Sequence, residues 1–404
     1  MKIFILLCFS FILFFLINSF TTPERFKKTN ISADLYDFSK YQSFDEYVNN
    51  YRKYIAKFRP ELSNHQISQI APLTRFSDNS SCQKKTGFVI LHGLTDTPFT
   101  MSDVAEKILS TTPCAIVLSP ILPGHALIPG ASLEVSYKDW VNSVNFTVKS
   151  LKEDGANKIV LIGLSTGGAL AFNYALKNPN IDQLILFSPA LDLQSPWYEV
   201  IGLKTATFAG NIFNSLAYFE KHDDENPYRY ESFSYKGINE LRNVTQENLA
   251  ILEKIDKFSV PTFLTLSEDD STINANRTLE ITNKKFSNIK GILYVNSLDQ
   301  KFNTTLKTQL GADPANKIIS LSHVCLQTSP LNPIFGKNVK KNYGCLHYSS
   351  SPEIFNECKN FAPDFIYGET SKINLEKYKK LSRITYNPHF DSLMSYLTEF
   401  LKNY

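Results

Sequence analysis

The sequence predicts an α/β protein with a mostly parallel central sheet and helices on both faces. Short, unbroken apolar runs alternate with helix-compatible segments from residue 87 onward. Strands buried on both faces of a parallel sheet carry such runs, and a helix returns the chain between them. The 404 residues are 43% hydrophobic and 20% charged, which is sufficient for one large domain with additions.

The alternating pattern places the elements in order along the chain. Strands are expected at 87–91, 115–118, 158–162, 183–187, 261–266 and 317–321, and helices near 101–109, 136–152, 168–177 and 390–401. The rhythm breaks at about 192–257, an aromatic stretch without a strong strand. An insertion of that length after a strand, at the ligand edge of a sheet, predicts a helical lid.

Residues 22–82 form an N-terminal extension to the domain at 83–404, with one amphipathic helix expected. Ser43-Phe-Asp-Glu46 matches a capping box, and apolar residues at helical spacing follow as far as Ile55. We interpret this helix as packing on the main domain by its aromatic face.

The first 21 residues read as a signal peptide or an N-terminal membrane anchor. Lys2 precedes an apolar run at 3–20, and Ser19 is the only small residue suited to a cleavage site. Export is therefore expected, either to the periplasm or medium or as a protein anchored to a membrane by this segment.

Export would allow disulfides among the cysteines. Cys82 and Cys114 precede strands expected to be neighbours, and Cys345 and Cys358 close a short polar loop, which leaves Cys325 unpaired. The alternative of free thiols stays open at this point. No Cys/His spacing resembles a zinc site, no cofactor is implied, and the net charge of +3 argues against nucleic acid as a partner.

A candidate nucleophile follows the strand expected at 158–162. Gly163-Leu-Ser-Thr-Gly167 stands between that strand and a helix, with Ser165 at the apex of the turn. The glycines allow strand and helix to approach closely, and a strained serine there is held out towards a substrate carbonyl. Upstream, His92-Gly93 ends the first strand. It is expected to aim the Leu94 amide into the same crevice, where Leu94 and Thr166 amides would form an oxyanion hole; His92 is interpreted as structural.

Four motifs together resemble the α/β-hydrolase family of the carboxylesterase and monoacylglycerol lipase type. They are Leu91-His-Gly-Leu-Thr-Asp-Thr-Pro98, Leu122-Pro-Gly-His125, Gly163-Leu-Ser-Thr-Gly167 and Ser267-Glu-Asp-Asp-Ser-Thr-Ile273. The resemblance implies an α/β-hydrolase fold and a serine nucleophile without cofactor or metal. It also assigns His125 a structural role.

In the same family the acid follows the strand after the lid, and the register of Ser267-x-x-Asp270-x-x-Ile273 implies Asp270. Asp269 is then a solvated neighbour, and Asp192 is an outside alternative.

Three histidines follow Asp270 and are candidates for the base. We favour His323, after the strand expected at 317–321, over His389. His389 precedes the last helix, where a helix N-terminus disfavours an imidazolium. His347, in a polar loop flanked by cysteines, is third.

These features predict a serine hydrolase that cleaves carboxylic esters through an acyl-enzyme, with short to medium acyl esters or monoacylglycerols as substrates. A lysophospholipase, thioesterase or amidase would use the same residues, and a non-catalytic binding module is the alternative from another class. The segment at about 337–388 lacks clear periodicity, and either a second cap or an interaction surface would fit it.

Overall fold

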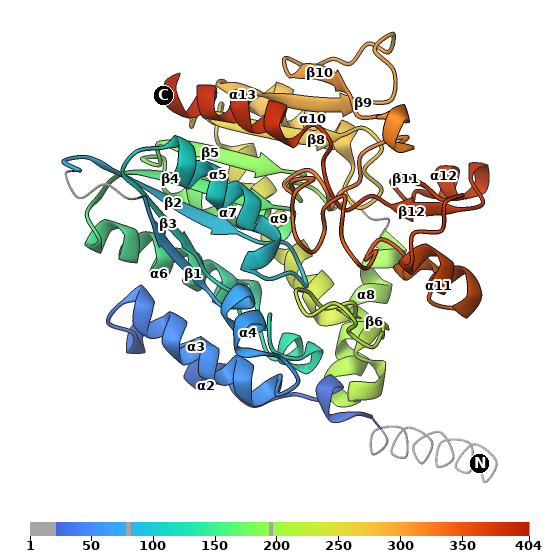
Figure 1. Cartoon of the computed structure of the whole chain (residues 1–404). Helices are drawn as coiled ribbons and strands as arrows, with labels where there is room; N and C mark the ends of the chain where they lie inside the picture. Colours follow the sequence, from blue (N-terminus) through green and yellow to red (C-terminus); the bar gives the residue numbers. More distant parts are fainter. Residues whose placement is uncertain (1–21, 78–81, 194–196, 404) are drawn as a thin grey trace.

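A computed structural model describes residues 22–77, 82–193 and 197–403 of the chain, so the expected signal or anchor segment lies outside the described residues. Its centre is an eight-stranded sheet (Figure 1). In spatial order the strands are β1 (Leu73–Phe76), β3 (Ala115–Ser119), β2 (Lys85–Leu91), β4 (Ala156–Leu164), β5 (Gln183–Phe187), β8 (Thr262–Ser267), β9 (Ile289–Val295) and β10 (Lys307–Leu310). Only β1 at the edge runs antiparallel to its neighbour; the other pairs are parallel.

Five of the six expected strands are confirmed as β2, β3, β4, β5 and β8. The strand expected at 317–321 is wrong. Lys317 has a positive φ of 56°, which turns the chain, and Ile318 alone pairs in isolated bridges to Asp313 and Tyr367. Ile318 and Leu321 are buried although the segment is a loop. The apolar pattern at 317–321 therefore reflects burial and not strand pairing. The sheet is completed instead by β9 and β10, which the sequence analysis did not place.

Helices cover both faces of the sheet. The helices of the described chain, including those that lie away from the sheet, are α2 (Ser32–Leu35), α3 (Phe44–Phe58), α4 (Asn64–Ile70), α5 (Ser102–Thr111), α6 (Tyr137–Glu153), α7 (Thr166–Lys177), α8 (Trp197–Ile212), α9 (Tyr235–Lys254), α10 (Ala275–Lys285), α11 (Pro352–Lys359), α12 (Lys372–Lys377) and α13 (Phe390–Asn403). Val89 and Leu91 of β2 join the core under α6 and α7, while Phe88 and Ile90 join the core under α5 and α13. This alternation explains why the central strands are apolar throughout.

The N-terminal extension packs on the main domain, as expected. α3 buries Tyr47 and Tyr51, whose hydroxyls donate to the carbonyl oxygens of Ile121 (3.1 Å) and His125 (3.0 Å). The extension holds α4 and β1 as well as the expected helix. It therefore braces the loop that follows β3.

The stretch between β5 and β8 contains α8, a small hairpin of β6 (Tyr218–Glu220) with β7 (Phe233–Ser234), and α9. The C-terminal stretch contains α11, α12 and the two-stranded parallel pair β11 (Ile366–Gly368) and β12 (Leu381–Arg383). Figure 1 shows α8, β6 and the C-terminal stretch on one side of the molecule, beyond one end of the sheet, whereas α9 returns to pack against α7. That the first stretch acts as a lid stays a prediction.

Both expected disulfides are confirmed: Cys82 pairs with Cys114 and Cys345 with Cys358, while Cys325 is a buried free thiol. Among the described residues, no helix has both the length and the apolar character that crossing a membrane requires.

Candidate active site

Ser165 occupies a strained turn between β4 and α7. Its φ of 51° and ψ of −111° lie in a region that L-residues rarely adopt. The turn is closed by the Ser165 amide, which donates to the Phe187 carbonyl at 3.0 Å. Side chains at Gly163 and Gly167 would collide with backbone, since a Cβ would lie 2.3 Å from Gly167 and from Leu91 respectively. The two glycines therefore permit the strand–turn–helix crossing that presents the serine.

Asp270 and His323 are joined by a buried hydrogen bond. The Nδ1 of His323 lies 2.7 Å from Oδ2 of Asp270, across 53 residues of sequence. Oδ1 of Asp270 accepts the amides of Thr272 (2.8 Å) and Ile273 (2.9 Å). Burial acts to raise the pKa of Asp270, but the charge and hydrogen bond of His323 and the two amides outweigh it, so the pKa lies below its ordinary value. An ionised carboxylate thus orients the imidazole.

The backbone of His323 is also anchored. Its amide donates to Oε2 of Glu369 at 2.9 Å. Glu369 is fully buried and forms an ion pair with Arg383, in which Nε of the arginine lies 2.9 Å from Oε1. Nη2 of Arg383 contacts Oε2 of Glu369 and Oγ1 of Thr272, each at 3.0 Å. One ion pair therefore touches both the histidine loop and the loop that holds Asp270.

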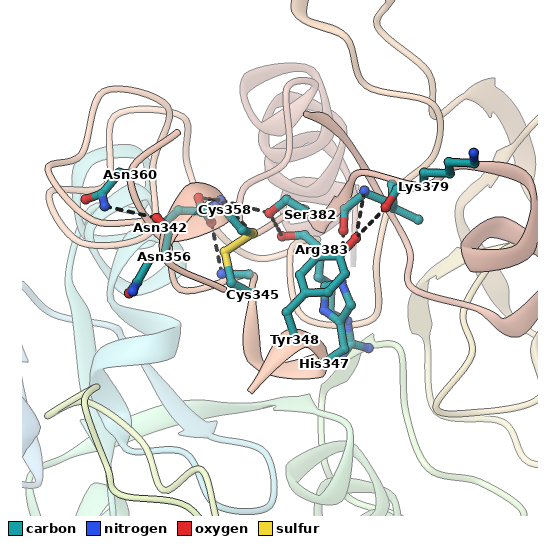
Figure 2. Close-up of a disulfide and its surroundings, with 12 residues drawn as sticks. Asn342, Cys345, His347, Tyr348, Asn356, Cys358, Asn360, Lys379, Ser382 and Arg383 are labelled. Atoms are coloured by element: carbon teal, nitrogen blue, oxygen red, sulfur yellow. Dashed lines mark hydrogen bonds between the residues drawn. A yellow bond between two sulfur atoms is a disulfide. The ribbon is translucent and has the colours of Figure 1, made fainter. Parts of the chain in front are cut away.

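A disulfide-closed loop supports the strand that carries Arg383. Figure 2 shows Cys345–Cys358 beside β12 and Arg383. Asn342 donates to Ser382 Oγ (2.9 Å) and to the Cys358 carbonyl (3.1 Å). The Arg383 amide donates to the Gly344 carbonyl at 2.9 Å. Glu369 and Arg383 were not found from the sequence, where neither belongs to a motif or a periodic segment.

The expected oxyanion donors lie at two backbone turns. Thr166 is the first residue of α7, where a helix leaves its amides without intrahelical partners. Leu94 follows Gly93 and precedes Thr95, whose φ is 68°. The turn at 93–96 and the start of α7 both adjoin Ser165, since a Cβ on Gly93 would lie 3.6 Å from the serine Cβ.

Asp96 is a second carboxylate beside Ser165 that the sequence analysis did not single out. The same Cβ on Gly93 would lie 2.7 Å from Oδ2 of Asp96, so the acid and the serine flank one glycine. Burial raises the pKa of Asp96 to about 6, against the lowering effect of the positive charges of Arg229 and His323. In the sequence, Asp96 is marked only by its place in Thr95-Asp96-Thr97, shortly after His92-Gly93.

The other candidate histidines are engaged elsewhere. His389 stacks on Tyr294, with ring centroids 5.8 Å apart. Nε2 of His347 contacts the Leu381 carbonyl at 2.9 Å, and burial lowers the pKa of His347 to about 4. Among the described residues, His323 is the histidine that is hydrogen-bonded to Asp270.

The two alternative acids, Asp192 and Asp269, also form hydrogen bonds or ion pairs with other residues. Asp192 pairs with Nε of Arg277 at 2.9 Å. Asp269 is half-buried and accepts hydrogen bonds from Asn296 (3.0 Å) and Asn374 (2.9 Å). Asp269 is thus a partly solvated neighbour of Asp270, as expected, and it also contacts Asn374 of the C-terminal stretch.

His92 and His125 shape the backbone near the site. Nε2 of His92 accepts the Leu122 amide at 3.0 Å, and Nδ1 of His125 lies 2.9 Å from the Leu122 carbonyl oxygen. Burial lowers the pKa of both rings, that of His125 to about 4, so both are neutral. Within the described part of the chain, no group of three His, Cys, Asp or Glu side chains is placed to hold a metal ion.

Comparisons with known proteins agree with this fold. The family model Hydrolase_4, described as serine aminopeptidase, S33, matches residues 83–294. Similar solved structures include one reported with LipS and LipT, two metagenome-derived lipolytic enzymes (20% identity, TM-score 0.45, covering 56% of this chain and 87% of that chain). Another is a Paleococcus ferrophilus monoacylglycerol lipase (16%, 0.43, 58% and 92%). A third is a soluble variant of the monoglyceride lipase of Saccharomyces cerevisiae (15%, 0.43, 56% and 82%). No curated protein matches the sequence.

Proposed function

The chain belongs to the Hydrolase_4 family of α/β-hydrolases, and from this premise we propose that it is a serine hydrolase that cleaves carboxylic esters through an acyl-enzyme. The hydrogen bond between His323 and Asp270 is the observation that carries the proposal. It joins, at 2.7 Å, an acid and a base separated by 53 residues. Asp270 follows β8 and Ser165 follows β4, and only β5 lies between these two strands in the sheet. A general base oriented by a buried carboxylate is what a serine nucleophile requires.

Each residue then has a defined task. Ser165 attacks the ester carbonyl while His323 takes its proton and later returns it to the leaving alkoxide. Asp270 holds the imidazole and stabilises its protonated form. The amides of Leu94 and Thr166 donate to the oxyanion, and each such donor contributes about 3 kcal/mol to transition-state stabilisation. Water then releases the acyl group by the same route.

The proposed substrates are short to medium acyl esters or monoacylglycerols. Support comes from the stretch between β5 and β8, where α8 exposes Ile201, Phe208 and Ile212, followed by Phe219. An apolar surface of this kind on an insertion at the ligand edge suits contact with an acyl chain or a lipid surface.

We also propose that the protein acts outside the cytoplasm. The two disulfides favour an oxidising compartment, and the apolar run at 3–20 has the composition of an export signal or anchor. Comparing the mass of the protein recovered from membrane and soluble fractions of the cell envelope would show whether the segment is kept. Recovery of the full-length chain with reduced cysteines in the cytoplasm would contradict the proposal.

The decisive experiment is labelling with a fluorophosphonate, which reacts with activated serines. Wild-type protein should be labelled, and Ser165→Ala should lose the label and about 10⁴- to 10⁶-fold of its esterase rate. Ser110→Ala, an exposed serine on α5, is the matched control and should label as the wild type does. Absence of labelling in the folded wild type, or equal labelling of Ser165→Ala, would remove the hydrolase proposal and leave a binding module.

Amide cleavage is the second candidate, because the matching family is described as serine aminopeptidase. Asp96, a buried carboxylate beside Ser165, would suit the ammonium group of a peptide N-terminus. Amino-acid p-nitroanilides should be compared with p-nitrophenyl esters of increasing chain length. Faster turnover of the anilides would replace the ester assignment, whereas preference for esters of four to eight carbons would support the proposed substrates.

A further inference from the structure

We propose that the alcohol part of the ester substrate carries an anionic group, a phosphate or a carboxylate, and that Arg229 binds this group in a cavity beside His323. The inference rests on the proposed function and adds a substrate class to it.

The cavity lies where a leaving alcohol would extend. It has a volume of about 400 Å³ and is bounded by Lys221, Arg229 and Phe233 on one side and by Tyr343, His347 and Thr385 on the other. Val324, which directly follows His323, forms part of its wall. The base returns its proton to the leaving alkoxide, so the alcohol part must be on the side of the base. A polar cavity at that position selects the alcohol and not the acyl chain.

Arg229 is a half-buried arginine whose head group is not committed to the protein. Its Nε is buried without a hydrogen-bond partner among the described residues, and no ion pair of its guanidinium occurs there. The carboxylates of Asp96 and Glu231 act on Arg229 by charge, but neither forms an ion pair with it. A guanidinium removed from water without a direct partner is unfavourable. A guanidinium matches phosphate and carboxylate with paired donors, so such an anion is the partner that fits.

Arg229 also lines a second, smaller cavity. This cavity is lined by Asp96, Arg229 and Val324, among others. Asp96 flanks the same glycine as Ser165. Arg229 therefore lines both the cavity that Asp96 borders and the larger cavity.

Of the other described charged groups that line the larger cavity, only Arg383 has a permanent counter-charge. Arg383 is paired with Glu369. Glu220 lies 3.6 Å from His222, the charge of which depends on protonation. Only Lys221 adds to Arg229 on the same wall, since it donates to a carbonyl oxygen at 2.8 Å and keeps its charge. Among the described residues that line this cavity and lack a permanent counter-charge, two cations, Lys221 and Arg229, face one carboxylate, Glu220, so positive charge is in excess.

The test compares esters that share one short acyl chain and differ only in the alcohol: 1-acylglycerol, 1-acylglycerol 3-phosphate and the acyl ester of glyceric acid. The readout is the ratio of kcat/KM for each anionic ester to that for the neutral one. Wild type should show a ratio of about ten or more for the phosphate or the carboxylate arm, and the higher ratio identifies the group. Arg229→Gln should lower this ratio by about 10- to 100-fold, mainly through KM, and Arg229→Lys should restore part of it.

Two controls keep the test decisive. Arg52→Gln, the same change at an exposed site on α3, should leave the ratio unchanged. In wild type, glycerol 3-phosphate should inhibit hydrolysis of the neutral ester competitively where glycerol at equal concentration does not, a measurement that depends on no variant. A ratio near one in wild type, or one unaffected by Arg229→Gln, overturns the anion site. Fluorophosphonate labelling and turnover of the neutral ester report separately on the proposed function.

Discussion

The two halves of the candidate site are built in opposite ways. The nucleophile half, residues 156–177, is a single uninterrupted strand, turn and helix, and its strain is held by contacts within that unit and with neighbouring strands. The base half, residues 307–389, contains only short strands and helices, and His323 lies in a loop without regular structure. One half is specified locally, and the other depends on long-range contacts.

The difference shows in what fixes each reactive side chain. Ser165 is placed by its own backbone and by glycines two residues to either side. His323 is placed by Asp270 and by Glu369, which lie 53 and 46 residues away in sequence. The base half should therefore be sensitive to substitutions at a distance, and activity should be lost there before the fold is lost.

Replacing each of the two candidate histidines by alanine separately gives the largest expected difference in kcat. His323→Ala should lower kcat by about 10⁴- to 10⁶-fold, because the serine loses its base. His389→Ala removes a ring that stacks on Tyr294 and should change kcat by less than about threefold, with some loss of stability. Acylation rates with a fluorophosphonate measure both. Retained acylation in His323→Ala, or its loss in a folded His389→Ala, would place the base elsewhere.

The locally specified half of the site could be predicted from the sequence, and the half that depends on long-range contacts could be predicted only in part. The five central strands, both disulfides and the serine turn were predictable because period, glycine spacing and order along the chain are local signals. His323 and His389 could not be separated with certainty, since their distance to Asp270 depends on how the loop after β10 folds. The run at 317–321 misled because burial in a loop leaves the same apolar pattern as burial in a strand.

Glu369 and Arg383 test whether contacts at a distance position the base. Glu369→Gln leaves an amide that still accepts the His323 backbone N–H but leaves Arg383 buried without its counter-charge. We expect kcat to fall about 10- to 100-fold with little change in KM, the magnitude typical of groups that orient a reactive residue. Steady-state kinetics, with the pH dependence of kcat, measure the effect.

Glu240→Gln is the matched control for this prediction. Glu240 is also buried, accepts a backbone amide from Tyr137 (3.1 Å) and pairs with Lys236 (3.0 Å), but it contacts neither His323 nor Asp270. It should lower the free energy of unfolding without a comparable fall in kcat. Equal losses of kcat in the two variants would mean that Glu369 acts only through stability.

Removing the disulfides should have the smallest effect on activity, and the two disulfides should differ in whether stability or activity is lost. Closing a loop of 32 residues (Cys82–Cys114) or 13 residues (Cys345–Cys358) stabilises the fold by about 4 and about 3 kcal/mol respectively in the chain-entropy account. Replacing both cysteines of a pair by serine should therefore destabilise the variant without Cys82–Cys114 slightly more than the variant without Cys345–Cys358.

Activity should fall more in the variant without Cys345–Cys358. The loop closed by Cys345–Cys358 holds β12 and hence Arg383, so its removal should lower kcat/KM a few-fold at a temperature where both variants are folded. The Cys82–Cys114 disulfide precedes β2 and β3, at the ends of these strands opposite to the site, so its removal should leave kcat/KM unchanged. Urea unfolding and ester kinetics on the same samples measure both quantities, and activity losses that simply follow the stability losses would show that the disulfide-closed loop has no part in positioning the base.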